Sequence, residues 1–501
     1  MRKISLFVLV TMLTTTFIQA QTYSGGSGTV ADPYLISSKT DMETLATAVN
    51  GNSNYSTGKY FLLTQDITNA ITTIIGISST YPFKGTFDGG NHSLSININV
   101  SSGQVAGIFG SITDATIKNL NVKGTLTSSY YATITGTICG QASGTANTIT
   151  NCNSSVLIST STTVAVGGIC GNANYVNINN CSNTGSIIAS GSNVGGICGS
   201  ATNVTISQCS NTGSVTASGD YTYQAAGICA NYGSVSSIAN CYNTGNIIIT
   251  NTATASTTGE VYAGGICAST IGTSSAKNIS NCYNTGSISA TRTGSGSYNC
   301  YAAGICAYGY SGNAITNCFN TGNVSAINGG SAGSYASRIS NYGTPANCYA
   351  LSSVVLNGVT TNSTNNKNGT DVNNISFFQD QNWIITNLNW DFTNIWKMSD
   401  INSVYNGLPI FIWQDDNSVV TATDTNNINN IEVYPNPANQ NMYINSNIPI
   451  NEIEIFDITG KLVKKTNIVN NINVSLFTNG IYYFCIHTNN STVVKKVVVS
   501  H

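Results

Sequence analysis

The chain has 501 residues, a formal net charge of −2 and only 7% charged side chains, with 49 glycines and 7 prolines. An ordinary globular domain carries about 25% charged residues. A charge so low and so nearly balanced gives no basis for binding nucleic acid or an anionic membrane. The polar, β-tolerant composition favours a soluble all-β protein.

The first twenty residues have the pattern of a secretory signal peptide. Arg2 and Lys3 precede an apolar run over 4–13, and small residues lead to Ala20. This run is too short to span a bilayer comfortably. We expect cleavage after Ala20 and export. No later segment stays apolar for about 18 residues, so we expect no membrane span in the mature chain.

Residues of about 25–65 are expected to cap the N-terminal end of the region that follows. A short helix is predicted over 41–49, because Leu45 and Ala48 recur at helical spacing. Asp41 is its predicted N-cap.

A Gly-Ile-Cys phrase recurs along the middle of the chain. It ends at Cys170, Cys198, Cys229, Cys267 and Cys306, after a Thr-Ile-Cys version, at intervals of 28 to 39 residues. Such a period is typical of stacked structural units.

Each unit contains three β-like runs and a turn, as in 194–199, 204–209 and 213–218. Val204 and Ile206 alternate with polar residues, which is the period of a strand. The turn reads Asn-Thr-Gly in five units. Glycine there would supply a positive φ, so we predict a bend at this place in every unit. Three strands and fixed corners per unit predict a parallel β-helix over 21–375.

The phrase G-I-C-G…I-x-N-C-x-N-T-G-x-V resembles the GLUG-motif repeats of bacterial surface proteins. Residues 25–29, 31–36 and 83–91 are similar to the opening coils of those proteins. The resemblance covers roughly residues 25–415 and implies a right-handed β-helix on the cell surface. Such proteins are adhesin-like, and the resemblance does not imply one activity.

The repeat contains paired cysteines at a spacing of 11 to 15 residues, and two interpretations stay open. Oxidation after export would close small in-coil loops. Alternatively, the thiols stack inward as small hydrophobes. The wide spacing and the absence of histidine argue against a metal site, and we expect no metal or other cofactor. The pairs are Cys139 and Cys152, Cys170 and Cys181, Cys198 and Cys209, Cys229 and Cys241, Cys267 and Cys282, and Cys306 and Cys318.

Charged side chains are too sparse for a recognisable active site. Five occur between 126 and 350: Asp220, Glu260, Lys277, Arg292 and Arg338. Glycoside hydrolysis needs two carboxylates a few ångströms apart. Many β-helix proteins act on polysaccharides, so such an enzyme stays the alternative. It would require Asp220, Glu260 and Arg292 to converge.

The connection before the Gly-Ile-Cys phrase lengthens in three successive units. Insertions at one repeat position bulge on one side, which is often the binding side. Tyrosine rings and a few charges there could hold a sugar or a peptide, although ordinary loops could also cover the solenoid edge. The candidate residues are Asp220, Tyr221, Tyr223, Glu260, Tyr262, Arg292, Tyr298 and Tyr301.

All four tryptophans lie between 383 and 413, among several phenylalanines. An open solenoid end needs a cap, so residues 376–414 are predicted to be the C-terminal cap. A carbohydrate platform is the alternative. Residues 415–430 are polar and form the predicted linker.

Residues 431–501 alternate as short strands and predict a small antiparallel β-sandwich. The motifs Tyr-Pro-Asn-Pro at 434–437, Thr-Gly-Lys-Leu-Val at 459–463 and Lys-Lys-Val-Val-Val at 495–499 resemble the type A C-terminal sorting domain of type IX secretion cargo. The resemblance implies a Bacteroidetes-type bacterium, crossing of the outer membrane through the type IX machinery, and removal of this domain. The cargo is then released or attached at the cell surface.

The sequence therefore predicts a secreted or surface-displayed adhesin-like protein. Its rigid β-helix would present loops to a glycan or a surface protein. The alternatives are a polysaccharide-degrading lyase or hydrolase and a passive structural rod.

Overall fold

The computed structural model divides the chain into two compact units, Met1–Asp416 and Asn417–His501. The predicted signal peptide and linker lie outside the described residues. The structure describes residues 23–103, 105–130, 133–221, 223–233, 237–253, 259–270, 278–294, 297–309, 314–357, 366–414, 432–445, 450–457, 461–467, 472–488 and 492–501.

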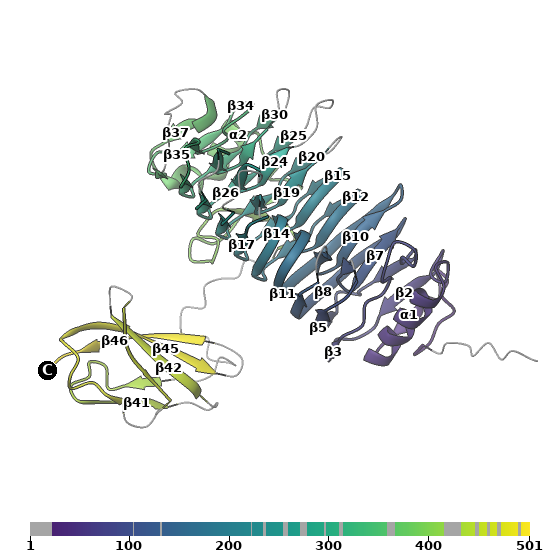
Figure 1. The fold of residues 1–501 in the computed structure, drawn as a ribbon, viewed down its shortest axis with the longest axis horizontal. Coiled ribbons are helices and arrows are strands. Elements are labelled where there is room, and N and C mark those ends of the chain that lie inside the picture. Colours follow the sequence, from purple (N-terminus) through teal and green to yellow (C-terminus); the bar gives the residue numbers. More distant parts are fainter. Residues whose placement is uncertain are drawn as a thin grey trace, which may run out of the picture. The chain divides into compact units, whose positions relative to one another are not determined.

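The first unit is a solenoid of parallel strands that stack coil upon coil (Figure 1). Its opening strands are β1 (Tyr34–Ile36), β2 (Tyr60–Leu63), β3 (Ile67–Ile71), β4 (Thr86–Asp88) and β5 (Ser93–Val100). Five long strands run around corners: β8 (Thr116–Ser128), β11 (Asn147–Gly167), β12 (Cys170–Asn179), β14 (Ile187–Gly195) and β15 (Cys198–Ser207).

The remaining solenoid strands fall into in-register columns. The column before the Gly-Ile-Cys phrase holds β6 (Val105–Ala106), β9 (Thr133–Gly136), β18 (Gln224–Ala226), β23 (Val261–Gly264), β28 (Cys300–Ala303) and β33 (Ser334–Ser337). The phrase itself ends where β7 (Phe109–Thr113), β10 (Cys139–Ser143), β19 (Cys229–Tyr232), β24 (Cys267–Thr270) and β29 (Cys306–Tyr308) begin.

Three further columns complete each coil. One holds β20 (Ser237–Ala239), β25 (Asn278–Ser280), β30 (Ala314–Thr316) and β34 (Thr344–Ala346). The next holds β13 (Ser182–Asn183), β16 (Ser210–Asn211), β21 (Tyr242–Asn243), β26 (Tyr283–Asn284), β31 (Phe319–Asn320), β35 (Tyr349–Leu351) and β37 (Thr370–Val372). The last holds β17 (Val215–Gly219), β22 (Ile247–Asn251), β27 (Ile288–Arg292), β32 (Val324–Asn328) and β36 (Leu356–Asn357).

The core is a stack of inward side chains that repeat from coil to coil. Ile178 pairs with Ile206, and Ile206 with Ile238, while their polar neighbours face outward. This is the alternation with a period of two that the sequence shows. Because parallel strands join equivalent positions, one apolar residue per coil builds a continuous ladder.

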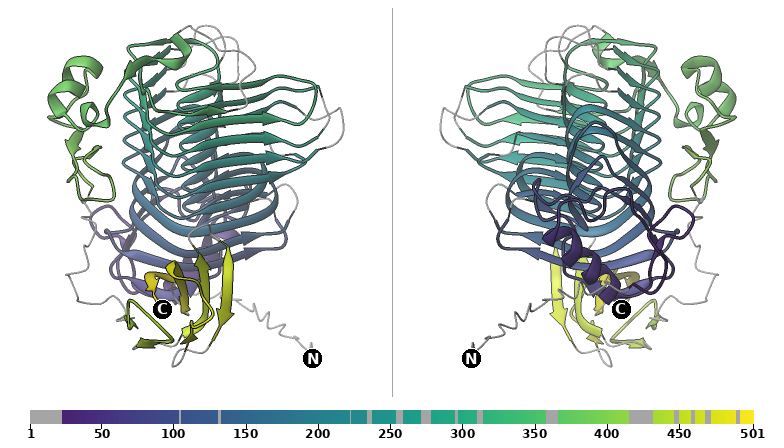
Figure 2. Two further views of the ribbon diagram at one scale, coloured as in Figure 1. Left: turned by 90° about the vertical axis from the view of Figure 1, so that its left-hand side faces the viewer. Right: turned by 90° about the vertical axis from the view of Figure 1, so that its right-hand side faces the viewer.

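A helix closes the N-terminal end of the solenoid (Figures 1 and 2). Helix α1 (Lys39–Gly51) buries Met42, Leu45 and Val49 against the first coils. Its N-cap is Ser38, so the prediction of Asp41 in that role was wrong. Asp41 stands at the third helical position, where the Asp41 amide donates to Ser38 Oγ at 3.1 Å and Ser38 Oγ donates to the carboxylate at 2.9 Å. This exchange resembles a capping box.

The expected positive φ at the Asn-Thr-Gly glycines is also wrong. The left-handed residue is instead the one before each cysteine of the second run, with φ of 52° at Asn240 and 52° at Asn281. The glycine is needed for close approach. A Cβ on Gly213 would lie 2.1 Å from the carbonyl oxygen of Gly185 in the adjacent coil.

The aromatic block predicted to close the C-terminal end packs on the side of the coils, beside the stack in Figure 2. Tyr242, Tyr283 and Phe319 project from successive coils and stack with ring-centroid distances of 4.9 and 4.8 Å. Trp390 and Trp396 cover them. The block contains η2 (Ile375–Phe377), α2 (Gln381–Leu388), β38 (Trp396–Met398) and β39 (Pro409–Phe411), and η1 (Asn366–Asn368) precedes it at the last coils of the solenoid. Large outward aromatics in three coils need cover along the side, which explains this placement.

The second unit contains two small antiparallel sheets that enclose Met442, Ile455 and Phe484. One sheet holds β40 (Glu432–Tyr434), β41 (Asn441–Asn445) and β44 (Ile472–Asn473). The other holds β42 (Ile450–Asp457), β43 (Leu462–Thr466), β45 (Gly480–Thr488) and β46 (Thr492–Val499). The predicted fold class, a parallel β-helix followed by a small antiparallel β-sandwich, is confirmed. Within the described parts, no helix is long and apolar enough to cross a membrane.

Candidate functional site

A column of tyrosines on successive coils forms the candidate binding surface. Gln224, Tyr262, Tyr301 and Tyr335 occupy one register position on β18, β23, β28 and β33. The ring centroids of Tyr262 and Tyr301 lie 5.4 Å apart with the planes at 14°. Those of Tyr301 and Tyr335 lie 4.9 Å apart at 15°. The repeat itself therefore positions three aromatic rings in a stack.

Two further tyrosines join this stack. Tyr308 and Tyr342 have ring centroids 4.4 Å apart, and the Tyr342 ring meets that of Tyr301 at 5.7 Å. We call the five rings of Tyr262, Tyr301, Tyr308, Tyr335 and Tyr342 the tyrosine shelf. Tyr342 is 38% exposed, whereas Tyr301 is 3% exposed and stacks between Tyr262 and Tyr335.

Glu260 is held at one edge of the shelf by three donors. The Tyr262 hydroxyl donates to its carboxylate, Asn299 Nδ2 donates at 3.1 Å and the Tyr301 hydroxyl at 3.4 Å. Burial, and then the neighbouring Glu260, raise the pKa of Tyr262. The phenol therefore stays protonated and serves as a donor.

A small hollow of about 110 Å³ opens beside the shelf. Asn341 fixes its floor: Nδ2 donates to the carbonyls of Ala302 at 2.9 Å and Ala307 at 3.2 Å, and Oδ1 accepts from Ser337 Oγ at 2.7 Å. The Lys367 ammonium lies 5.5 Å from the centroid of the Tyr342 ring. The hollow is lined by Tyr301, Tyr335, Ala336, Ser337, Asn341, Tyr342 and Lys367.

The other predicted site residues lie on neighbouring coils of the same side. Tyr223 is linked to the shelf through its carbonyl, which accepts from the Tyr262 amide at 2.8 Å. Tyr221 is 73% exposed. The exposed Asp220 carboxylate accepts from Thr252 Oγ1 at 2.6 Å, so its hydrogen-bond partner differs from those of Glu260.

Arg292 was expected to face a ligand, but the structure buries its side chain completely. Its Nη1 donates to the Gly259 carbonyl at 2.9 Å, and its guanidinium lies 5.4 Å from the Tyr298 ring centroid. Asn251 and Asn328 stand at the same register position in adjacent coils and bind loop carbonyls in the same way. Arg292 therefore fixes the base of an insertion.

Sequence reasoning found Tyr262 and Tyr301 and missed Tyr308, Tyr335, Tyr342 and Lys367. Tyr335 could have been found by extending the repeat alignment one unit further, because it follows Tyr301 in register. Lys367 lies in η1 and reaches the site only through the last turns of the solenoid, which no repeat pattern predicts.

The two cysteines of each repeat form two inward ladders, whereas Cys300 and Cys485 lie apart from them. Cys170, Cys198 and Cys229 pair in register on successive coils. All fifteen cysteines are free, so the in-coil disulfides considered above are absent from the structure. The thiols that contact Cys181 are Cys152 and Cys209 of the adjacent coils. Across the described residues, no group of three His, Cys, Asp or Glu side chains is placed to hold a metal ion.

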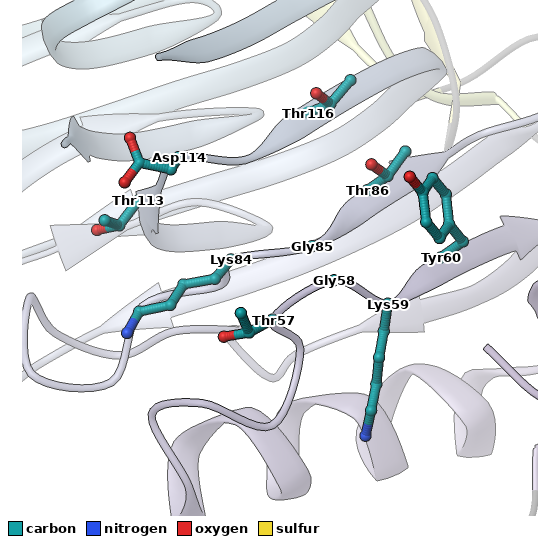
Figure 3. Close-up of a pocket in the computed structure, with 10 residues that line it drawn as sticks. All are labelled: Thr57, Gly58, Lys59, Tyr60, Lys84, Gly85, Thr86, Thr113, Asp114 and Thr116. Carbon is teal, nitrogen blue, oxygen red and sulfur yellow. The ribbon is translucent and has the colours of Figure 1, made fainter. Parts of the chain in front are cut away.

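A larger hollow lies elsewhere, on the first coils, with a volume of about 410 Å³ (Figure 3). Its charged groups are already engaged. Lys59 Nζ lies 3.6 Å from the Tyr55 ring centroid, and Lys84 Nζ donates to Asn54 Oδ1 at 3.0 Å. The Asp114 carboxylate accepts from the Thr145 amide at 2.7 Å. Both lysines extend away from Thr86 in Figure 3, so this groove lacks a convergent set of groups.

Residues 432–500 match the family model of the secretion system C-terminal sorting domain. The chain is thus a type IX secretion substrate, exported to the cell surface or the extracellular space, and its last unit interacts with that machinery. The GLUG resemblance stays a prediction.

Two solved structures are similar to the chain. One, from Bacteroides ovatus and provisionally described as an immunoglobulin A1 protease, is 22% identical with a TM-score of 0.41, covering 78% of this chain and 96% of its own. An IgA1 protease is 16% identical with a TM-score of 0.37, covering 64% of this chain and 22% of its own. No curated protein matches the chain.

Proposed function

We propose that the exported protein is an adhesin-like binding protein, whose β-helix presents the tyrosine shelf to a glycan or a surface protein. The observation that carries this proposal is the in-register stack of Tyr262, Tyr301 and Tyr335, with Tyr342 exposed beside it. Tyrosine offers a broad face and a hydroxyl at a low cost in conformational entropy, which suits recognition.

The scaffold supports this role because it is rigid. Each shelf strand pairs with a strand of the adjacent coil, as β28 does with both β23 and β33. The rings are thus ordered before any ligand arrives, and binding need not bear the cost of ordering them.

The charged groups favour binding over catalysis. Glu260 is held by Tyr262, Asn299 and Tyr301, while Asp220 is held by Thr252. Arg292 is buried at a loop base. Catalysis would need an acid and a base that point toward the same substrate and can reach it. The hydrogen bonds of Glu260, Asp220 and Arg292 instead direct these side chains toward neighbouring protein groups.

The test uses the full chain and a panel of immobilised polysaccharides and surface proteins. Both retention and shortening of the polysaccharides are recorded. We expect retention without products, and Tyr342→Ala should weaken the affinity about tenfold through lost ring contact. The matched control is Tyr175→Ala, which removes a ring that is 46% exposed on another part of the solenoid.

Equal losses in both variants would contradict the assignment of the shelf. Shortened products would favour the polysaccharide-degrading alternative. Retention of no panel member would favour a passive rod.

A further inference from the structure

We propose that the tyrosine shelf selects an acidic polysaccharide, with Lys367 binding the carboxylate of one sugar unit in the hollow beside Tyr342. This inference rests on the proposed function and names the ligand class. Three features of the hollow carry it: its size, the positive charge of Lys367 and the pairing of its strands.

The hollow is large enough for a charged substituent. Its volume of about 110 Å³ exceeds the roughly 10–15 Å³ that a cavity needs to hold one water molecule. A carboxylate fits such a space together with the carbon atom that bears it. The ring that bears it would then lie against the faces of Tyr335 and Tyr342, which stand at the rim.

The charge available to a ligand there is positive. Lys367 forms no ion pair with a described carboxylate, and its Nζ lies over the Tyr342 ring. The neighbouring Arg338 is already paired with Asp371 at 2.5 Å. Glu260 does not line the hollow, and it is separated from Tyr342 by the Tyr301 hydroxyl, which lies 3.4 Å from the Glu260 carboxylate and 3.3 Å from the Tyr342 hydroxyl. An ammonium that forms no ion pair with a described carboxylate is suited to bind the carboxylate of a ligand.

The pairing of the strands favours a polysaccharide over a peptide. A peptide commonly adds as a strand to a free sheet edge or anchors an apolar side chain in a deep pocket. Here β28 is paired on both sides and β33 pairs with β28, and the hollow combines tyrosine rings with hydroxyl, amide and ammonium groups. Sugars offer hydroxyls to such groups and C–H faces to aromatic rings.

The experiment measures the affinity of the full chain for polygalacturonate, alginate and hyaluronan. Each is compared with its carboxyl-reduced form, in which an alcohol replaces every carboxylate. We expect at least one acidic polymer to bind about tenfold or more tightly than its reduced form, and less tightly as salt is raised. Lys367→Met should abolish this preference, and Lys367→Arg should retain it.

The matched control is Lys123→Met, which removes an exposed lysine from a different part of the solenoid. It should leave the preference unchanged. Equal binding of acidic and reduced polymers would refute the inference and leave the proposed function standing. If the chain binds a surface protein of the panel and no polysaccharide, the inference is refuted, but the proposed function stands with a protein as the ligand. Retention of nothing would overturn both.

Discussion

Replacing Asn243 by alanine should destabilise the solenoid more than any exposed polar substitution. Asn243 is fully buried in a ladder with Asn211 and Asn284 of the adjacent coils. Its Nδ2 donates to the Gly245 carbonyl at 2.7 Å and to Asn284 Oδ1 at 2.7 Å, and its Oδ1 accepts from Asn211 Nδ2 at 2.8 Å. Alanine removes all three hydrogen bonds.

The expected loss follows from those contacts. Each bond contributes about 1 kcal/mol net, and a buried group left without its partner costs about 1–3 kcal/mol. Asn211, Gly245 and Asn284 each lose one partner. We therefore expect the free energy of unfolding to fall by about 3–5 kcal/mol. Since Asn243 and Asn284 share a bond, the double alanine variant should lose less than the sum of the two single losses.

The measurement is denaturant unfolding of the full chain, followed by circular dichroism and tryptophan fluorescence. The matched control is Asn246→Ala. Asn246 is exposed, and its Oδ1 accepts from the Ser287 amide at 3.0 Å, where water can substitute. It should cost less than about 1 kcal/mol. Equal losses of unfolding free energy for Asn243→Ala and Asn246→Ala would refute the conclusion that the buried asparagine ladder stabilises the solenoid through its hydrogen bonds.

Three other predictions concern the fold. Gly213→Ala should lower the free energy of unfolding by about 3 kcal/mol, because its Cβ would meet the Gly185 carbonyl. The control Gly51→Ala has open space around it and should not destabilise the protein. Similar free energies for both variants would contradict the close-approach argument. Under non-reducing conditions at pH 8, alkylation should leave the buried thiols of the native chain unmodified, since burial raises the pKa of thiols such as Cys152. After unfolding it should modify all fifteen cysteines. A number of alkylated cysteines that is lower by two or a multiple of two would show disulfides. Trp396→Ala, which empties a fully buried site stacked on Trp390, should cost about 3–5 kcal/mol and make the block of residues 375–414 sensitive to protease; unchanged resistance would place the block's stability elsewhere.

The repeat made the fold predictable, because a period near thirty residues with three alternating runs has few packing solutions. Local details were less accessible. Asn-Thr-Gly reads as a turn that needs a positive φ, but in a stacked solenoid the glycine is fixed by the carbonyl of the adjacent coil. Sequence patterns carry no information on that approach. Asp41 likewise has the residue type of an N-cap, but the helix begins at Lys39 and Ser38 accepts from the Asp41 amide.

The aromatic block shows why position on the coil matters more than composition. Its tryptophans were predicted to close an end, because open ends need covering. The sequence also places Tyr242, Tyr283 and Phe319 at one repeat position, and these outward rings attract the block to the side. An alignment that treated outward aromatics as a column would have found this surface.

The same coils carry two columns of outward aromatic rings. The strongest argument for the site is that a separate segment of the chain covers one column and not the other in the described structure. Tyr242, Tyr283 and Phe319 are fully buried beneath a segment that packs against them with three tryptophans. The column of Tyr262, Tyr301 and Tyr335 packs in the described structure with Tyr308 and Tyr342 from its own coils, and Tyr342 stays 38% exposed. One aromatic column is sealed along the side of the solenoid, whereas Tyr342 beside the other column stays exposed, next to an ammonium that forms no ion pair with a described carboxylate. This is the arrangement expected of a ligand-binding surface.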